Sequence, residues 1–514
     1  MIVLAPALAL LALWLLGALV LSLAHARHGT LLERLTTDFV AGIVALATLG
    51  MTTIALGGRI AVWHTYLLTA VLAVAYLWRR RITPRGGETG PSPGRQPNSR
   101  SNATPDHVTH GVLETPSTDL RPPAHAPTLH TSRLATVVHA ATARLTPRNL
   151  LGASAFIILL LTTSAGQDRL AWDGWAFWTL KARILFHEGT LPLETLVPAG
   201  PYPYAHPDYP LAIPLLDWWL FRHAGVPYPV LASLAGVLWF AALAPLVWAA
   251  LAESAGARIA ALATLGTTAF WHLAFYATGG YADIAITLAL LGSVLELRRL
   301  RAGWAGGPAT GAALRLALYL TLAALAKNEG LALALIGAVA AVARGLGAGE
   351  RRPGYYVVFA LPLIALAPWF IFTRTLGLVP QHLEGAELTL GDAVTRIPII
   401  LAALGKLLFS RAWVPLPFLV LVAMYAALRR GRFEARTEWW VVGAYAAVIG
   451  GVYLGTSLEL EWLLRTTIDR MVGHVVPAIV VLSLWEIWPM TASTAGQAYT
   501  SATLPDDLAP ADHA

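Results

Sequence analysis

The residues best suited to catalysis are one acidic residue and two basic residues that lie close together in the sequence. Asp173 stands in the aromatic run Trp172-Asp173-Gly174-Trp175-Ala176-Phe177-Trp178, and Lys181 and Arg183 follow it closely. A positioned carboxylate can take a proton as a general base, whereas a cationic pair beside it can bind phosphate. Two structural alternatives remain open. Asp173 could cap the helix that it begins, and the two basic side chains could anchor that helix at the headgroup layer of a membrane.

Other ionisable residues stand at the ends of apolar runs rather than inside them. They are His206, Asp208, Asp283, Lys327 and Arg470, and Glu329 lies close enough to Lys327 to pair with it. A charge in the middle of a bilayer is costly and is usually functional. Transporters tend to place such charges near the midplane, between two matching halves, and the sequence has neither feature. The pattern therefore favours an active site that opens to one face of a membrane.

The composition indicates that lipid is the main solvent of this chain. Hydrophobic residues make up 56% of its 514 residues, charged residues 13%, and the mean hydropathy is +0.61. The net charge of +7 does not point to nucleic acid, because a surplus of Lys and Arg in such a chain marks cytoplasmic loops. Since the chain has no cysteine, disulfides, thiolate nucleophiles and Cys-ligated metals are excluded.

The apolar runs predict an all-α, polytopic transmembrane protein with about thirteen spans. We expect the spans near residues 2–23, 39–56, 60–78, 150–163, 230–251, 259–277, 281–297, 314–325, 331–342, 355–372, 413–428, 439–454 and 471–488. Clusters of Arg at residues 79–81, 298–301 and 429–432 predict the cytoplasmic ends, which puts the loop 168–228 and Asp173 on the extracytoplasmic side. Residues 208–221 are too short to span, and residues 393–409 resemble an interfacial helix.

These assignments divide the chain into four parts. Residues 1–81 form an accessory unit of three transmembrane helices, residues 82–146 a disordered cytoplasmic linker rich in Pro, Gly, Ser and Arg, residues 147–490 the core, and residues 491–514 a disordered cytoplasmic tail. The first helix lacks the basic start of a secretory signal, so we expect it to be retained. Ala24-His25-Ala26 nevertheless resembles a cleavage site.

Five motifs carry a resemblance to a known family. Asp173, Lys181-Ala182-Arg183 and the turn at Gly189 are similar to the first periplasmic loop of the C-type membrane glycosyltransferases, notably lipid A aminoarabinose transferases and protein O-mannosyltransferases. The elements that follow come in the family's order: His206-Pro207-Asp208-Tyr209-Pro210, Tyr281-Ala282-Asp283, Leu325-Ala326-Lys327 and Arg470 to Pro477. Two departures are Met471, where Tyr is usual, and Asp208-Tyr209, inserted where a second Pro is expected.

The resemblance implies an inverting glycosyltransferase of the cell envelope in a prokaryotic plasma membrane. A sugar such as mannose would pass from a polyprenyl phosphate to an acceptor glycan, lipid or protein, with Asp173 as general base and Asp283 as a second catalytic acid residue. Lys181, Arg183, His206, Asp208, Lys327 and Arg470 would bind the substrate or its phosphate. The acidic residues and His206 could also hold Mg, Mn or Zn, a cofactor that some members of the family use and others do not.

Two other classes of function stay open at this stage. A transporter or flippase of lipid-linked sugars would use the same basic cavity, but would bind the donor without consuming it. A membrane scaffold would use the apolar helices to bind partners and would tolerate loss of the charged cluster. The chain has no glycine-rich phosphate loop of the usual form, which favours a lipid-linked donor over a soluble nucleotide.

Overall fold

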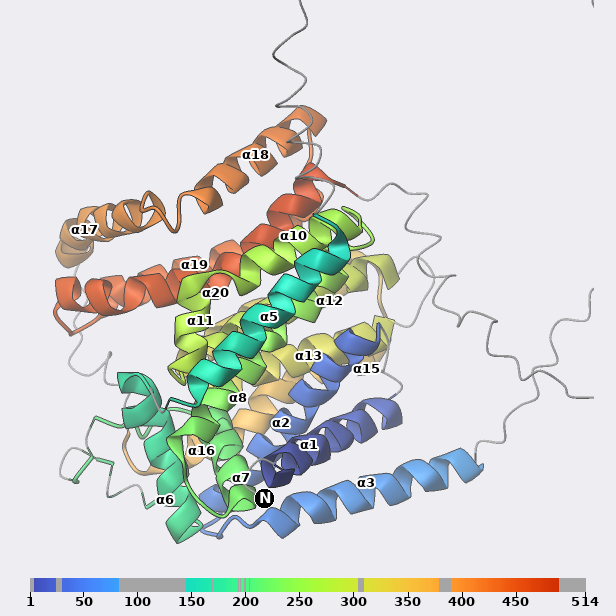
Figure 1. Cartoon of the computed structure of the whole chain (residues 1–514), viewed down its shortest axis with the longest axis vertical. Helices are drawn as coiled ribbons and strands as arrows, with labels where there is room; N and C mark the ends of the chain where they lie inside the picture. Colours follow the sequence, from blue (N-terminus) through green and yellow to red (C-terminus); the bar gives the residue numbers. More distant parts are fainter. Residues whose placement is uncertain are drawn as a thin grey trace, which may run out of the picture. The chain divides into compact units, whose positions relative to one another are not determined.

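The described chain is built from helices and turns. The structure, a computed structural model, describes residues 4–24, 30–82, 145–167, 170–192, 194, 196–197, 200–202, 204–303, 309–378 and 390–489, and these residues include no β-strand. The predicted all-α fold is confirmed for this part of the chain (Figure 1). Most of the predicted linker, the predicted tail and residues 25–26 of the cleavage-like motif lie outside the described residues.

Every predicted apolar run coincides with one or more helices. The first part of the chain forms α1 (Leu4–Leu23), α2 (Leu31–Ala55), α3 (Val62–Ile82), α5 (Pro147–Ala165), η1 (Gly174–Thr179), α6 (Leu180–Glu188), α7 (Ala212–Ala224), α8 (Pro229–Ala241), α9 (Leu243–Leu251), α10 (Ala257–Thr268) and α11 (Trp271–Thr278). The second part forms α12 (Asp283–Gly303), α13 (Ala309–Ala326), α14 (Asn328–Gly347), α15 (Pro353–Val357), η3 (Val358–Ala360), α16 (Leu361–Thr375), α17 (Leu390–Leu408), α18 (Pro415–Arg430), α19 (Arg436–Gly455) and α20 (Leu460–Ile487).

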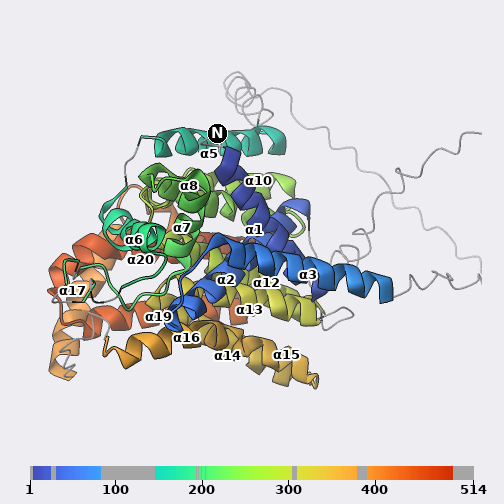
Figure 2. The ribbon, with the colours of Figure 1, turned by 90° about the horizontal axis from the view of Figure 1, so that it is seen from below.

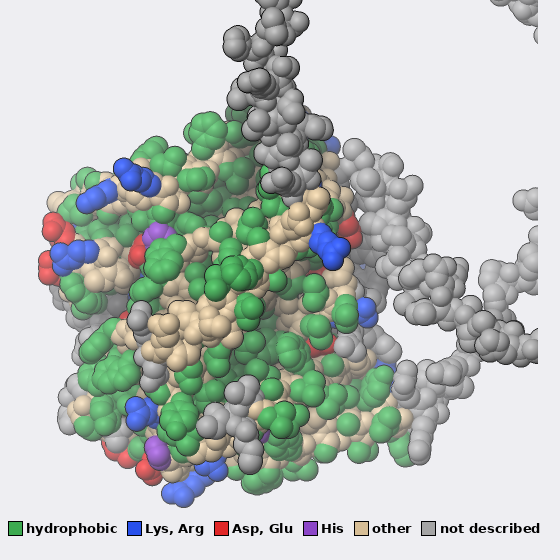
Figure 3. Space-filling model, in the orientation of Figure 1, with side chains coloured by type: hydrophobic (Ala, Val, Ile, Leu, Met, Phe, Trp, Pro, Cys, Tyr) green, Lys and Arg blue, Asp and Glu red, His purple; other side chains and the backbone are tan. Residues whose placement is uncertain are grey.

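Many of these helices can cross a membrane. Within the described residues, seven spans are long and apolar enough, and the bent pair α10 and α11, which meet at 53°, raises the number to eight. The seven are α1, α2, α5, α8 with α9, α14, α15 with α16, and α20. Figure 3 shows hydrophobic side chains over most of one face, with charged side chains mainly near its margins. The chain is therefore an integral membrane protein by its helices, whereas thirteen spans stay a prediction.

Helices α12 and α13 lie in the interior of the bundle. In Figure 2, α5 lies on one side of them and α14, α15 and α16 on the other. The apolar residues of α12 are buried on all its sides, including the consecutive residues Ile284, Ala285 and Ile286 at 0% exposure, as expected of a core helix. The helix begins at Asp283 and carries Arg299 sixteen residues later, which separates these two polar positions by about 24 Å along its axis.

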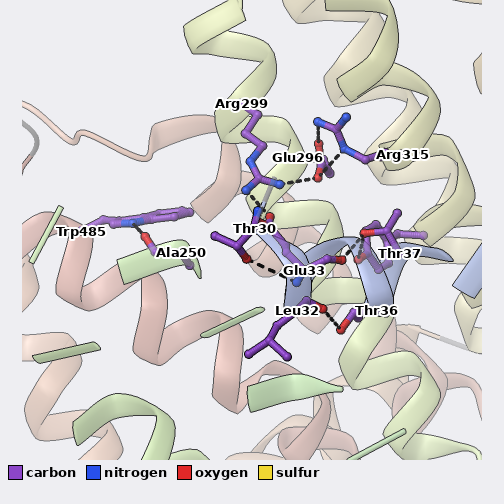
Figure 4. A network of polar contacts seen from close by, with 11 residues as sticks. Thr30, Leu32, Glu33, Thr36, Thr37, Ala250, Glu296, Arg299, Arg315 and Trp485 are labelled. Carbon is purple, nitrogen blue, oxygen red and sulfur yellow. Dashed lines mark hydrogen bonds and ion pairs between the residues drawn. The ribbon is translucent and has the colours of Figure 1, made fainter. Parts of the chain in front are cut away.

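The distal part of α12 carries a buried network of charges that joins three helices (Figure 4). Arg299 of α12 contacts both Glu33 of α2 and Glu296 of its own helix. Glu296 in turn accepts two hydrogen bonds from Arg315 of α13, at 3.0 and 2.8 Å. Nearby, the hydroxyls of Thr37 and Tyr319 lie 3.2 Å apart. Helix α2 is thus held against the core by ionic contacts as well as by apolar packing.

The first two helices belong to the same packed body as the core. The described residues up to Tyr76 and from Thr146 onward belong to one compact unit. Within this unit, the indole N–H of Trp219 in α7 donates to the carbonyl of Ala9 in α1, at 3.0 Å. Helix α7 has 13 residues, too few to span a bilayer, and its residues from Ala212 to Phe221 are all buried. The division into an accessory unit, residues 1–81, and a core, residues 147–490, stays a prediction.

Candidate active site

The backbone at Asp173 is fixed by a close contact with the turn between α11 and α12. Asp173 precedes η1, a π-helical turn of six residues. The N–H of Ala171 donates to the carbonyl of Gly279 at 3.1 Å, and a Cβ added to Gly174 would lie 2.0 Å from the same oxygen. Glycine is therefore required at position 174. Because π-helical turns are rare and often occur at functional sites, this local geometry itself marks the position.

The carboxylate of Asp173 does not cap its own helix. It makes no capping hydrogen bond, and Oδ2 instead forms an ion pair with the Nη1 group of Arg470 in α20. The guanidinium of Arg470 also lies over the ring of Tyr281, 5.0 Å from its centroid. Two of the predicted residues, 297 positions apart, thus meet at one point.

Asp173 and Arg470 line a cavity of about 550 Å³. Its lining residues are of two kinds. The polar and aromatic ones are Trp172, Asp173, Phe177, Tyr204, His206, Tyr209, Tyr281, Lys327, Glu329, Tyr453, Trp462, Thr466, Thr467 and Arg470, and the aliphatic ones are Ile449, Val452, Leu458, Leu463 and Met471. A cavity of this size with a few convergent polar groups is the usual form of a small-molecule site.

A chain of polar contacts runs from the cavity into the protein. The Nζ of Lys327 lies 3.2 Å from Oε1 of Glu329 and 3.6 Å from Oδ1 of Asp283. The same oxygen of Asp283 is 2.9 Å from Nε2 of His474, whose Nδ1 is 3.0 Å from the hydroxyl of Tyr445. Asp283 does not line the cavity. It contacts Lys327 from outside the cavity and thereby orients this cation, which does line the cavity.

His206 lines the cavity through a strained segment of backbone. Its φ of +47° is the one positive value among the described non-glycine residues, and its ring stacks on Tyr209 with centroids 4.7 Å apart. Beneath it, the fully buried Lys181 donates from Nζ to the carbonyl of His206 at 2.5 Å. Burial lowers the pKa of Lys181 to about 7, against the opposing effect of the Asp208 carboxylate. Lys181 therefore supports the loop and does not face the cavity.

The structure places two other predicted residues away from this cavity. Arg183 is exposed and lines a separate surface groove with His187 and Glu188. The Oδ2 of Asp208 accepts a hydrogen bond of 2.6 Å from the amide of Asn328, and Asp208 lines a smaller neighbouring cavity of about 150 Å³. In this arrangement Asp173, His206, Lys327 and Arg470 come together, with Asp283 and Lys181 behind them.

The sequence did not reveal the aliphatic lining of the cavity or the contacts of His474 with Asp283 and Tyr445. A signal was present in α20, where Leu463, Thr466, Thr467, Arg470 and Met471 all line the cavity. Their spacing of three, four, seven and eight residues places them on one helical face. The contacts of His474 with Asp283 and with Tyr445 had no such signal, because three separate helices supply these side chains.

The acidic residues and His206 do not cluster as a metal site would require. Among the described residues, no group of three or more His, Asp or Glu side chains could hold a metal ion. The Asp173, Asp208 and Asp283 carboxylates contact Arg470, Asn328 and Lys327 respectively. A divalent cation therefore stays a prediction from the resemblance.

Comparison of the chain with models of protein families, with curated proteins and with solved structures found no match. Inferences about function consequently rest on the cavity itself.

Proposed function

We propose that this chain is an inverting glycosyltransferase that moves a sugar from a polyprenyl phosphate to an acceptor hydroxyl or amine. The observation that carries the proposal is the pairing of Asp173 with Arg470 in a cavity lined by polar, aromatic and aliphatic side chains. Carboxylates and aromatic rings suit a sugar, two cations suit a phosphate, and apolar side chains suit a prenyl chain.

In the proposed reaction the acceptor oxygen or nitrogen forms a bond with the anomeric carbon while the bond from that carbon to the phosphate oxygen breaks. The acceptor proton passes to Asp173, and the bonding electron pair leaves with the polyprenyl phosphate. Arg470 and Lys327, which both line the cavity, stabilise the charge on the leaving phosphate. Attack from the face opposite the phosphate inverts the anomeric configuration.

The ion pair between Asp173 and Arg470 suggests how the donor prepares the base. The guanidinium of Arg470 engages a carboxylate oxygen of Asp173. A donor phosphate competes for the same guanidinium and so frees that oxygen to accept a proton. On this proposal the cavity lies at the extracytoplasmic face of the membrane, about thirteen spans surround it, and the Arg-rich end of α12 is cytoplasmic.

The experiment supplies the purified full chain, in lipid nanodiscs, with a panel of polyprenyl-phosphate sugars and an acceptor-containing extract, and measures the release of polyprenyl phosphate. Asp173→Asn should lower turnover about 100- to 10,000-fold, while donor binding is equal or tighter because the phosphate no longer competes with a carboxylate for Arg470. Glu188→Gln is the matched control, because Glu188 lies on α6 outside the cavity. Unchanged turnover in Asp173→Asn would contradict the base assignment. Donor binding without turnover in the wild-type chain would favour a transporter instead.

A further inference from the structure

Asp283 has a hydrogen-bond partner that is not part of the cavity. Its Oδ1 lies 2.9 Å from Nε2 of His474, but 3.6 Å from the ammonium of Lys327. The first distance is that of a hydrogen bond, whereas the second is too long for one. His474 therefore determines where this oxygen lies, and the charge on the oxygen then attracts Lys327.

The pattern of hydrogen bonds around His474 assigns its protons. An ionised carboxylate only accepts hydrogen bonds, so Nε2 of His474 donates to Asp283. In the neutral imidazole Nδ1 then accepts, and the hydroxyl of Tyr445, 3.0 Å away, is the matching donor. The ring of Tyr445 also lies nearly parallel to the imidazole, at 22°. Tyr445 thus supports both the tautomer and the orientation of His474.

Three helices supply this series of side chains, and each member is buried. Tyr445 of α19, His474 of α20 and Asp283 of α12 are 0%, 1% and 2% exposed. Hydrogen bonds are stronger in such surroundings than in water, and a connected series of them holds its members in one geometry. Neither His474 nor Tyr445 lines the cavity. Their influence on it therefore passes through Asp283.

Lys327 is a cation whose position depends on such support. Its backbone is extended at the junction of α13 and α14, and its side chain ends in a point charge on a flexible four-carbon stem. The ammonium lies between two carboxylates, those of Asp283 and Glu329. Glu329 belongs to the same segment of chain, so the contact with Asp283 is the one that ties this ammonium to another helix, α12.

We propose that His474 is a positioning residue of this cavity: through its hydrogen bond to Asp283, it holds the ammonium of Lys327 where the phosphate of a lipid-linked donor binds. This inference rests on the proposed function, since it takes Lys327 as a ligand of that phosphate. Tyr445 supports His474 in turn. A histidine inside α20 then contributes to binding of the donor without touching it.

The test measures binding of bare polyprenyl phosphate to the full chain in nanodiscs. His474→Leu should weaken this binding about tenfold, because it removes a hydrogen bond to a charged group. His474→Gln, whose amide N–H can replace Nε2, should restore most of the binding. His223→Leu is the matched control and should bind as the wild type does. His223 also contacts a tyrosine hydroxyl, that of Tyr66 at 2.7 Å, but it does not line the cavity.

A pair of backgrounds separates positioning from a merely structural role. In a Lys327→Gln chain, His474→Leu should change binding by less than about twofold, because the cation that His474 positions is absent. If Lys327→Gln does not fold, Asp283→Asn serves as the background, with the same expectation. If His474→Leu does not fold, Tyr445→Phe replaces it, with an expected loss of about threefold in the otherwise wild-type chain.

The outcomes distinguish this inference from the proposed function. A loss of equal size in both backgrounds, or unchanged binding in His474→Leu, would overturn the inference and leave the proposed function intact. Binding that Lys327→Gln leaves unchanged would overturn it as well, since Lys327 would then not hold the phosphate. If the wild-type chain bound no polyprenyl phosphate, the proposed function itself would fail, and the inference with it.

Discussion

The buried charges between α2, α12 and α13 give a prediction about stability that does not depend on any function. Glu296 has two cationic partners, Arg299 and Arg315. Glu33 has one among the described residues, which is Arg299. The side chains of Glu33 and Glu296 are only 3% and 1% exposed. Removing the positive charge of Arg299 therefore leaves Glu33 buried without compensation, but leaves Glu296 paired with Arg315.

The magnitudes follow from this asymmetry. Arg299→Met keeps the apolar stem and removes the charge, and breaking a buried ion pair costs about 3–5 kcal/mol. Because the Arg299 side chain is 26% exposed, we expect about 3 kcal/mol. Glu33→Gln should cost only about 1 kcal/mol, since Arg299 keeps Glu296 and the amide can still accept from the Thr30 N–H. The double variant should be more stable than Arg299→Met alone.

The assay is the unfolding of the full chain in mixed micelles, followed by the fluorescence of its 19 tryptophans. Arg432→Met is the matched control, because Arg432 pairs with Glu434 at 2.9 Å but its side chain is 75% exposed, so its loss should cost under about 1 kcal/mol. The reasoning would be refuted if Glu33→Gln destabilised the Arg299→Met chain as it does the wild type. It would also fail if Arg299→Met and Arg432→Met had the same effect.

Two further predictions concern the loop that carries Asp173. Gly174→Ala should abolish turnover and destabilise the chain by about 1–3 kcal/mol, since its Cβ would overlap the Gly279 carbonyl. Gly152→Ala is the control, because a Cβ at that position meets nothing within 4 Å. Equal turnover and equal stability of the two variants would contradict the prediction. Lys181 should make stability depend on pH, because its pKa falls from 10.5 to about 7 on folding, so that between these values the unfolded chain binds more protons. The wild type should therefore gain stability relative to Lys181→Met as the pH rises from about 7 to 10, and a constant difference between the two would disprove the shift.

The sequence predicted the helices well because a bilayer imposes long apolar runs. Residues 150–163, for example, correspond to α5, and residues 439–454 correspond to α19. The start of α20 was predicted less well. The apolar run suggested a helix from Met471, yet the helix begins at Leu460, so that Arg470 lies well inside it. Charged residues at a membrane surface interrupt an apolar pattern without interrupting the helix, and hydropathy alone cannot distinguish the two.

The sequence by itself determined the class of the molecule and the kinds of side chain available for chemistry. Composition indicated that lipid is the main solvent, and residue type made Asp173 a candidate base. Both conclusions depend on the residues themselves and not on contacts between distant parts of the chain. The tertiary structure alone decided that Asp173 meets Arg470, that Asp283 stands behind Lys327, and that Asp208 and Arg183 lie outside the cavity. Ion pairs form between side chains that packing brings within a few ångströms, and that distance is set by the arrangement of helices far apart in the chain.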